Sequence, residues 1–192
     1  AVIRVAGRGT QAVLSVKPGA VDFGAVRIPS AQVADTTLRV TNTGSAPLRL
    51  VGASFTNNRF RVLNFNPRTL EPNQGTDIRI SFDPLVPRSE TATLHLLSQS
   101  PDAILSKTDT LRVSVTGKGT APDIAPSTAI LDFGLVDIGQ QTVLPLEVTN
   151  TGTAPLTITR VTARSDQFHV DRTLGVSRDT VFSVPARDTI LI

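Results

Sequence analysis

Apolar and polar side chains alternate along most of this chain. The alternation is clearest at residues 36–42, 76–82, 90–98 and 109–117, and in the second of these runs Ile78, Ile80 and Phe82 are separated by polar residues. A period of two places one face of a β-strand in a core and the other in water. No segment shows a convincing helical period. Further strands are predicted at 47–55 and 59–65, after a first edge segment at 12–28.

Turn residues separate these runs. The 13 Pro and 13 Gly fall mostly between the predicted strands, where a fixed or positive φ is needed. The triplet Asn42-Thr43-Gly44 is expected to form a tight turn between the second and third strands, because Asn and Gly tolerate left-handed backbone. Short strands at regular spacing predict an all-β sandwich.

The sequence also repeats itself with a period of about 110 residues. Val-Asp-Phe-Gly at 21–24 returns as Leu-Asp-Phe-Gly at 131–134, and Thr-Asn-Thr-Gly-Ser-Ala-Pro-Leu at 41–48 returns with one change at 149–156. Gly-Arg-Gly-Thr at 7–10 returns as Gly-Lys-Gly-Thr at 117–120. Preserved turn residues at a fixed spacing indicate one domain type used as a serial module.

The repeat predicts three parts. Residues 1–10 match the last strand of a preceding module, 11–120 form a complete immunoglobulin-like module, and 121–192 form a second module whose last two strands are missing. Strands of the second module are expected near Phe133, 144–148, 156–158, 168–170 and 190–192. The chain lacks an initial Met, so we expect it to be a piece of a longer protein. The short joint, with Pro122 and Pro126 just beyond it, favours an extended array.

These motifs resemble those of a known family. Phe-Gly-x-Val at 23–26 and 133–136, Asn-Thr-Gly-x-x-Pro-Leu at 42–48 and 150–156, and the closing Gly-x-Gly-Thr are similar to the ASH (ASPM/SPD-2/Hydin) domain and to the bacterial choice-of-anchor D repeat. The resemblance covers essentially the whole chain. It implies tandem immunoglobulin-like antiparallel β-sandwiches of the PapD-like and major-sperm-protein-like type, without catalytic residues.

Composition narrows the function classes. The absence of Cys excludes disulfides and thiol chemistry. The net charge is +3, but the Arg residues are scattered and form no basic run. The eight Phe are the only aromatic residues and most occupy inward positions, so no stacking platform for nucleic acid is expected. No apolar stretch is long enough to span a bilayer, so membrane insertion is not expected.

Few residues are candidates for chemistry. His95 and His169 fall on outward strand positions and are expected to be solvated. Gly-x-Gly at 7–9 and 117–119 has no helix after it, so a phosphate cradle is not predicted. The joint offers only Asp123 as a calcium ligand, although calcium needs six or more oxygens. We therefore assign no catalytic, cofactor-binding or metal-binding residue, and we expect no enzyme.

The expected function is structural. We predict a repeat of a large bacterial secreted or cell-surface protein, such as a stalk, adhesin or extracellular filament subunit. The alternative is a segment of an intracellular ciliary or centrosomal scaffold. Partners are expected to be proteins, either neighbouring modules or copies of the chain itself. Residues 1–10 of one molecule could pair with the incomplete second module of the next and build a fibre, although simple truncation also explains both ends of the chain.

Overall fold

The structure is a computed structural model of the 192-residue chain, and it describes residues 2–29, 33–100, 108–170 and 181–192. The chain divides into two compact units, residues 1–119 and residues 120–192. Each unit is described by itself. All the regular structure in the described residues consists of β-strands, as the alternation predicts. No helix in this part of the chain is long and apolar enough to cross a membrane.

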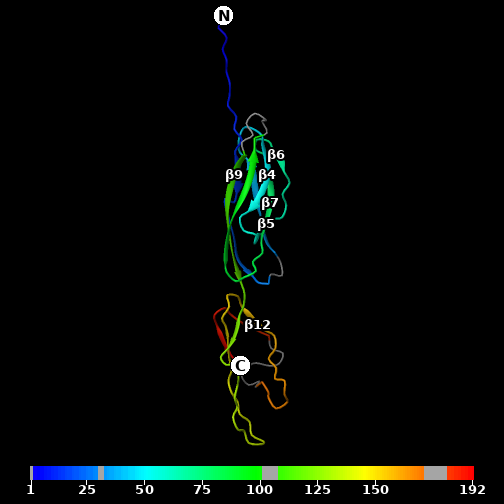
Figure 1. The fold of residues 1–192 in the computed structure, drawn as a ribbon, viewed down its shortest axis with the longest axis vertical. Helices are drawn as coiled ribbons and strands as arrows, with labels where there is room; N and C mark the ends of the chain where they lie inside the picture. The colour runs from blue at the N-terminus through cyan, green and yellow to red at the C-terminus, as the bar shows by residue number, and fades with distance from the viewer. Residues whose placement is uncertain (1, 30–32, 101–107, 171–180) are drawn as a thin grey trace. The chain divides into compact units, whose positions relative to one another are not determined.

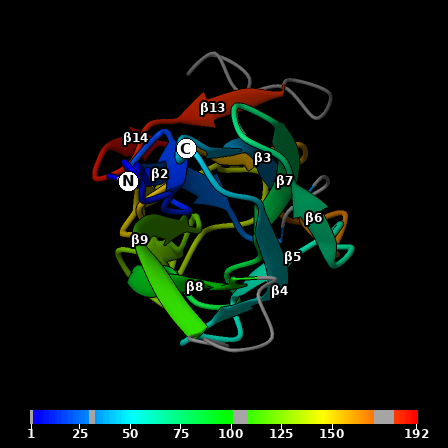
Figure 2. The same cartoon turned by 90° about the horizontal axis from the view of Figure 1, so that it is seen from above.

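The first unit is a sandwich of two antiparallel sheets. The four-stranded sheet has the order β1 (Leu14–Lys17), β3 (Ala34–Asn42), β7 (Gly75–Phe82), β5 (Phe60–Val62). The five-stranded sheet has the order β2 (Ala20–Arg27), β9 (Thr108–Thr120), β8 (Ser89–Gln99), β4 (Leu48–Phe55), β6 (Arg68–Leu70). Figure 2 shows β3 and β7 on one side of this unit and β8 and β9 on the other. The predicted all-β, immunoglobulin-like class is confirmed.

The core of the first unit lies between the two sheets. Its fully buried side chains come from alternate strand positions, and the largest are Phe82, Leu38, Leu50, Ile78, Ile80, Leu94 and Leu96. The rings of Phe60 and Phe82 stack with their centroids 4.6 Å apart, and Phe23 lies 5.7 Å from Phe82. Complete burial of one such side chain stabilises the fold by roughly 1.5–3 kcal/mol. These rings are therefore core residues, as expected.

Each strand segment predicted for the first unit contains a strand, and two details differ. The edge segment at 12–28 is split, because β1 pairs with β3 whereas β2 lies beside β9 in the other sheet. One short chain segment thus contributes an edge to both sheets. The strand β6 was not predicted, since its three residues are too few to show a period and it forms through pairing with β4. In Figure 1, β4, β7 and β9 run lengthwise through this unit.

The second unit has two small sheets. One has the order β10 (Ile124–Pro126), β11 (Glu147–Asn150), β14 (Thr189–Leu191), and the other pairs β12 (Leu156–Ile158) with β13 (Phe182–Val184). Its described core contains Val148, Ile158 and Val184. The strands expected at 156–158 and 190–192 are found nearly in place, and that at 144–148 is found only in part.

Two strand predictions in the second unit are wrong. The segment around Phe133 and the segment 168–170 form no strand. The corresponding segments of the first unit are β2 and β5. They are strands because each pairs with a neighbour, β2 with β9 and β5 with the end of β7. Such edge strands depend on their partner, because their few residues have little strand preference of their own.

Candidate functional site

The Asn-Thr-Gly motif of the first unit is a buried hydrogen-bonding centre. Asn42 is fully buried. Its Nδ2 donates to the carbonyl of Ala46 at 2.8 Å and to that of Leu70 at 3.0 Å. Its Oδ1 accepts from the N–H of Gly44 at 3.0 Å and from that of Val13 at 3.4 Å. One side chain therefore ties the turn to the start of the first strand and to β6.

The second copy of the motif makes the same contacts. Asn150 is also fully buried. Its Nδ2 donates to the carbonyls of Ala154 at 2.8 Å and Val184 at 3.0 Å, and its Oδ1 accepts from the N–H groups of Gly152 at 3.1 Å and Asp123 at 3.2 Å. The repeated motif thus holds the segment that leads into each unit, and it does so through main-chain atoms.

The glycine of this motif is required by a close approach. A Cβ on Gly44 would lie 2.1 Å from the carbonyl oxygen of Gln11, and a Cβ on Gly152 would lie 2.4 Å from that of Ala121. Neither glycine is among the described residues with positive φ. The predicted reason for the motif, a left-handed backbone, is therefore wrong. Glycine is present because the incoming chain passes directly over it.

A second repeated turn uses glycine for its conformation. Gly24 has φ 65° and Gly134 has φ 62°. In each case the Asp two residues earlier, Asp22 or Asp132, accepts a hydrogen bond from the glycine N–H at 2.9 Å. These recurring carboxylates cap a turn, and among the described residues no group of three or more His, Cys, Asp and Glu could hold a metal ion.

The Gly-x-Gly motif at the end of β9 also reflects close packing. A Cβ on Gly117 would lie 2.6 Å from the ring of Phe82, and one on Gly119 would lie 2.2 Å from the carbonyl oxygen of Val86. Gly119 donates its N–H to the carbonyl of Arg88 at 2.8 Å. The motif lets an aromatic ring and a loop backbone approach the strand.

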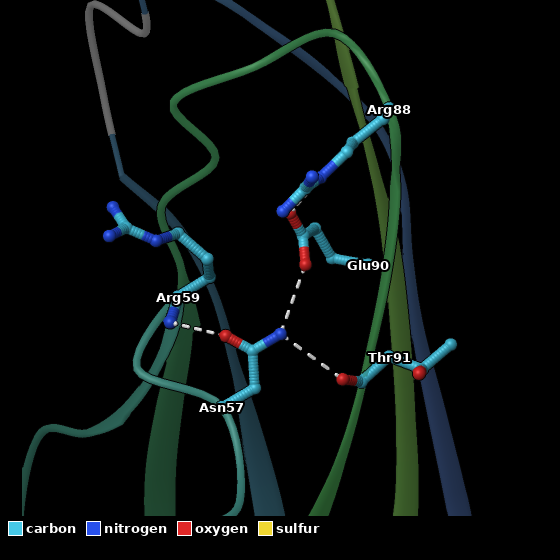
Figure 3. A network of polar contacts seen from close by, with 5 residues as sticks. All are labelled: Asn57, Arg59, Arg88, Glu90 and Thr91. Atoms are coloured by element: carbon cyan, nitrogen blue, oxygen red, sulfur yellow. Dashed lines mark hydrogen bonds and ion pairs between the residues drawn. The ribbon is translucent and has the colours of Figure 1, made fainter.

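The sequence analysis missed a polar network at one end of the first unit (Figure 3). Glu90 is buried, and its carboxylate accepts from Arg88 Nε at 2.7 Å and from Asn57 Nδ2 at 3.0 Å. Asn57 also donates to the carbonyl of Thr91 at 3.2 Å and accepts from the N–H of Arg59 at 3.0 Å. The network ties the turn before β5 to the start of β8. The only sign of this network in the sequence was Glu90, a charged residue at an inward position of β8.

These hydrogen bonds stabilise the charged form of the carboxylate. The bond from Arg88 and then the bond from Asn57 hold the pKa of Glu90 below its ordinary value of 4.5, although burial acts in the opposite direction. The donors therefore outweigh desolvation. Both carboxylate oxygens of Glu90 are thus engaged by side chains of the network, which supports a structural role.

The two histidines belong to different units. His95 is half-buried on the outer face of the five-stranded sheet, opposite Arg112, and His169 is exposed in the second unit. His95 is thus less solvated than expected, because Arg112 and Ser54 flank it on adjacent strands. The residues opposite His95 on the two adjacent strands therefore offer no carboxylate to orient it for catalysis.

The two outer faces of the first unit differ in chemistry. On the four-stranded sheet, Arg39 pairs with Asp77 at 3.0 Å and Arg79 pairs with Asp35. All four side chains are 35–56% exposed, so each pair contributes little to stability. The five-stranded sheet presents hydroxyl groups in cross-strand pairs, from Thr91, Thr93, Ser114 and Thr116.

Two hollows stand out on the described surface. The more enclosed one has a volume of about 30 Å³ and lies among Leu50, Phe65 and Ile78. A space of this size holds about one water molecule. The other has a volume of about 440 Å³, is wider open to solvent, and is lined by Gly24, Glu90 and Lys118 among others. In the loop after β7, the side chain of Leu85 is 61% exposed and that of Val86 is 41% exposed. This surface offers strand edges, polar faces and an apolar loop, which suit protein contacts better than the binding of a small substrate.

Comparison with known proteins gives a family match. A family model described as a HYDIN/CFA65/VesB-like, Ig-like domain matches residues 12–116, which is more than half of the chain. A comparison with curated proteins finds no significant match.

Several solved structures are similar to this chain. The ASH/PapD-like domain 7 of human CEP192 is 14% identical, with a TM-score of 0.48, over 62% of this chain and 95% of that one. A Porphyromonas gingivalis protein of unknown function is 20% identical, with a TM-score of 0.45, over 93% and 80%. The VesB protease of Vibrio cholerae is 20% identical, with a TM-score of 0.38, over 53% and 31%.

Proposed function

This chain belongs to the HYDIN/CFA65/VesB-like family of Ig-like domains, and from that premise we propose that it is a non-catalytic structural and interaction repeat of a large bacterial secreted or cell-surface protein. The observation that carries the proposal is the duplicated asparagine centre. Asn42 and Asn150 make matching bonds to the segment that leads into each unit. Such an attachment serves a unit that is joined in series.

The surface chemistry supports the same proposal. The exposed apolar loop at Leu85 and Val86 suits the apolar core of a protein interface, and the hydroxyl and ion pairs suit its polar rim. A catalytic role would need titratable or nucleophilic side chains that are free to act on a substrate. The one buried carboxylate of the first unit's described residues, Glu90, is instead committed to Arg88 and Asn57.

The compartment can be tested on cells of the source organism. We would treat intact cells with a protease and detect the protein with an antibody raised against residues 11–119. Cleavage on intact cells is expected for a secreted or surface protein. Protection until the cells are lysed would overturn the surface proposal and favour the alternative, an intracellular ciliary or centrosomal scaffold.

We further propose that the partner is another copy of the chain, joined by strand exchange through residues 1–10. In the described part of this segment Val2, Ile3 and Val5 are 85–95% exposed. In the second unit the segment 130–137 forms no ladder, and Val136 is 40% exposed, whereas its first-unit counterpart Val26 is 8% exposed. An added strand would cover this segment.

Molar mass tests the strand-exchange proposal. We would measure light scattering after size-exclusion chromatography over a concentration series, with and without residues 1–10. A mass that rises with concentration and returns to that of a monomer without residues 1–10 is expected. Equal masses for both chains would remove residues 1–10 as the joining segment while leaving the repeat proposal untouched.

A further inference from the structure

The segment 130–137 of the second unit has free main-chain groups. From Leu131 to Val136, the one main-chain hydrogen bond in the described structure runs from the N–H of Gly134 to the side chain of Asp132. Figure 1 shows no strand in this part of the chain. In the first unit the corresponding segment is β2, which pairs with β9. Free N–H and C=O groups of this kind can pair with an added strand.

The repeat shows which residues such a strand would turn inward. Residues 2–10 correspond to residues 112–120 of β9, because both end in Gly-x-Gly-Thr. In β9 the side chains of Val113 and Val115 are fully buried. Their counterparts in the repeat are Ile3 and Val5. The counterpart of Val2 is the exposed Arg112, so a strand in the place of β9 would turn Val2 outward.

The first unit also shows which charges would meet. Asp22 of β2 and Lys118 of β9 line the same hollow, of about 440 Å³. In the repeat, Asp132 is the counterpart of Asp22 and Arg8 is the counterpart of Lys118. A strand that lies beside 130–137 as β9 lies beside β2 would therefore bring Arg8 to Asp132.

The two segments have complementary charge. Residues 2–10 contain two Arg and no acidic residue, whereas residues 130–137 contain two Asp and no basic residue. The corresponding part of the first unit, β2, is neutral, because it contains Asp22 and Arg27. In the second unit Asp137 takes the place of Arg27. Opposite charges across an interface select the partner and fix its register.

We propose that residues 2–10 of a second copy lie beside residues 130–137 in the register of β9 beside β2, with Arg8 facing Asp132. This inference rests on the strand exchange proposed above, and it adds the residues that select the incoming segment. Asp132 is exposed, and its Oδ1 accepts the N–H of Gly134 at 2.9 Å, which fixes the carboxylate. No described residue binds its Oδ2, which leaves that oxygen for the guanidinium of Arg8.

A charge exchange tests the register. In the full chain, we would measure molar mass by light scattering over a concentration series for Arg8→Glu, Asp132→Arg and the variant with both changes. Each single change places like charges together and should weaken association about tenfold, whereas the double change should restore it. Arg61→Glu is the matched control for charge, because Arg61 is an exposed arginine of β5 in the first unit. It should associate like the unchanged chain.

A second pair of variants tests which face of the added strand is buried. Val5→Asn places an amide at an inward position and should weaken association about tenfold or more. Val2→Asn is the matched control, since it makes the same change at an outward position and should have little effect. Val2 and Val5 are 95% and 91% exposed in this structure, so neither change disturbs the fold of the single chain.

The outcomes separate this inference from the proposal on which it rests. If removal of residues 1–10 abolishes association but the double charge change does not restore it, strand exchange stands and the register is wrong. Equal effects of Val2→Asn and Val5→Asn would also overturn the register. If the unchanged chain is a monomer, or if removal of residues 1–10 changes nothing, both the strand exchange and this inference are wrong.

Discussion

At the scale of single residues, buried amides and one carboxylate organise the ends of the strands. Asn42 and Asn150 each make four or more side-chain bonds to main-chain groups, and Glu90 accepts two charge-stabilising bonds. Among the described residues, no buried side-chain nitrogen or oxygen lacks a hydrogen-bond partner. A buried polar group satisfied in this way specifies one geometry, since any other leaves donors and acceptors unpaired.

Replacement of Asn42 by Ala should strongly destabilise the first unit. The change leaves the carbonyl of Leu70 without its side-chain partner in a buried site, and the N–H of Val13 without its partner in a part-buried one. We expect a loss of about 3 kcal/mol in the free energy of unfolding. Urea denaturation followed by circular dichroism measures it. The exposed Asn58→Ala is the control, and a loss of similar size there would contradict the argument.

Replacement of Glu90 by Gln should make stability less dependent on pH. A lowered pKa in the folded state means that the carboxylate stabilises the fold above its ordinary value of 4.5 and that this contribution is lost as the pH falls below it. The unchanged chain should therefore exceed Glu90→Gln in stability at about pH 7, and the two should converge near pH ~3. Denaturation over a pH series measures this gap, and a gap independent of pH would contradict it.

At the scale of elements, glycines decide where one segment can cross another. Gly44 lies under the main chain of Gln11, and Gly117 lies against the ring of Phe82. Gly24 has a different role, since it supplies a positive φ. A further turn has the same geometry in both units, with Asn73 and Arg187 each at φ 68°. The repeated glycines are thus required for two different physical reasons, close approach and positive φ, and the sequence alone does not distinguish them.

Substitution of Gly44 by Ala should detach the segment before β1. The new Cβ would lie 2.1 Å from a backbone oxygen that cannot move without breaking its own bonds. We expect a loss of about 2 kcal/mol in unfolding free energy and faster exchange of the Thr43 amide. Gly19→Ala is the matched control, because a Cβ on Gly19 would have nothing within 4 Å. If both variants were equally stable, close approach would not explain the motif.

At the scale of the whole molecule, the two units differ in core and in charge. Fifteen buried apolar residues form the described core of the first unit, and three form that of the second. Residues 1–119 contain 14 Lys and Arg against 8 Asp and Glu, whereas residues 120–192 contain 5 against 8. The overall charge of +3 is therefore the sum of a basic first unit and an acidic second unit.

The units should open independently, the second before the first. Amides of β11 should exchange with solvent faster than those of β8 and β9, because local stability follows the burial that supports each strand. Asn42→Ala should accelerate exchange in the first unit alone, and Asn150→Ala in the second alone. Hydrogen exchange read by mass spectrometry measures this. A change that spreads through both units would mean that they unfold together.

Alternation and repetition are local properties, and they were sufficient to predict the main strands of the first unit, its sandwich class and its buried phenylalanines. They also identified the motif around Asn42, but they attributed it to a left-handed turn, which is wrong. Its role depends on a segment 29 residues earlier in the chain, Val13, which only the fold brings near. The same holds for Glu90 with Asn57, 33 residues apart. Hydrogen bonds between distant segments produce no periodic pattern in a sequence. Only the tertiary structure, which brings those segments together, determines them.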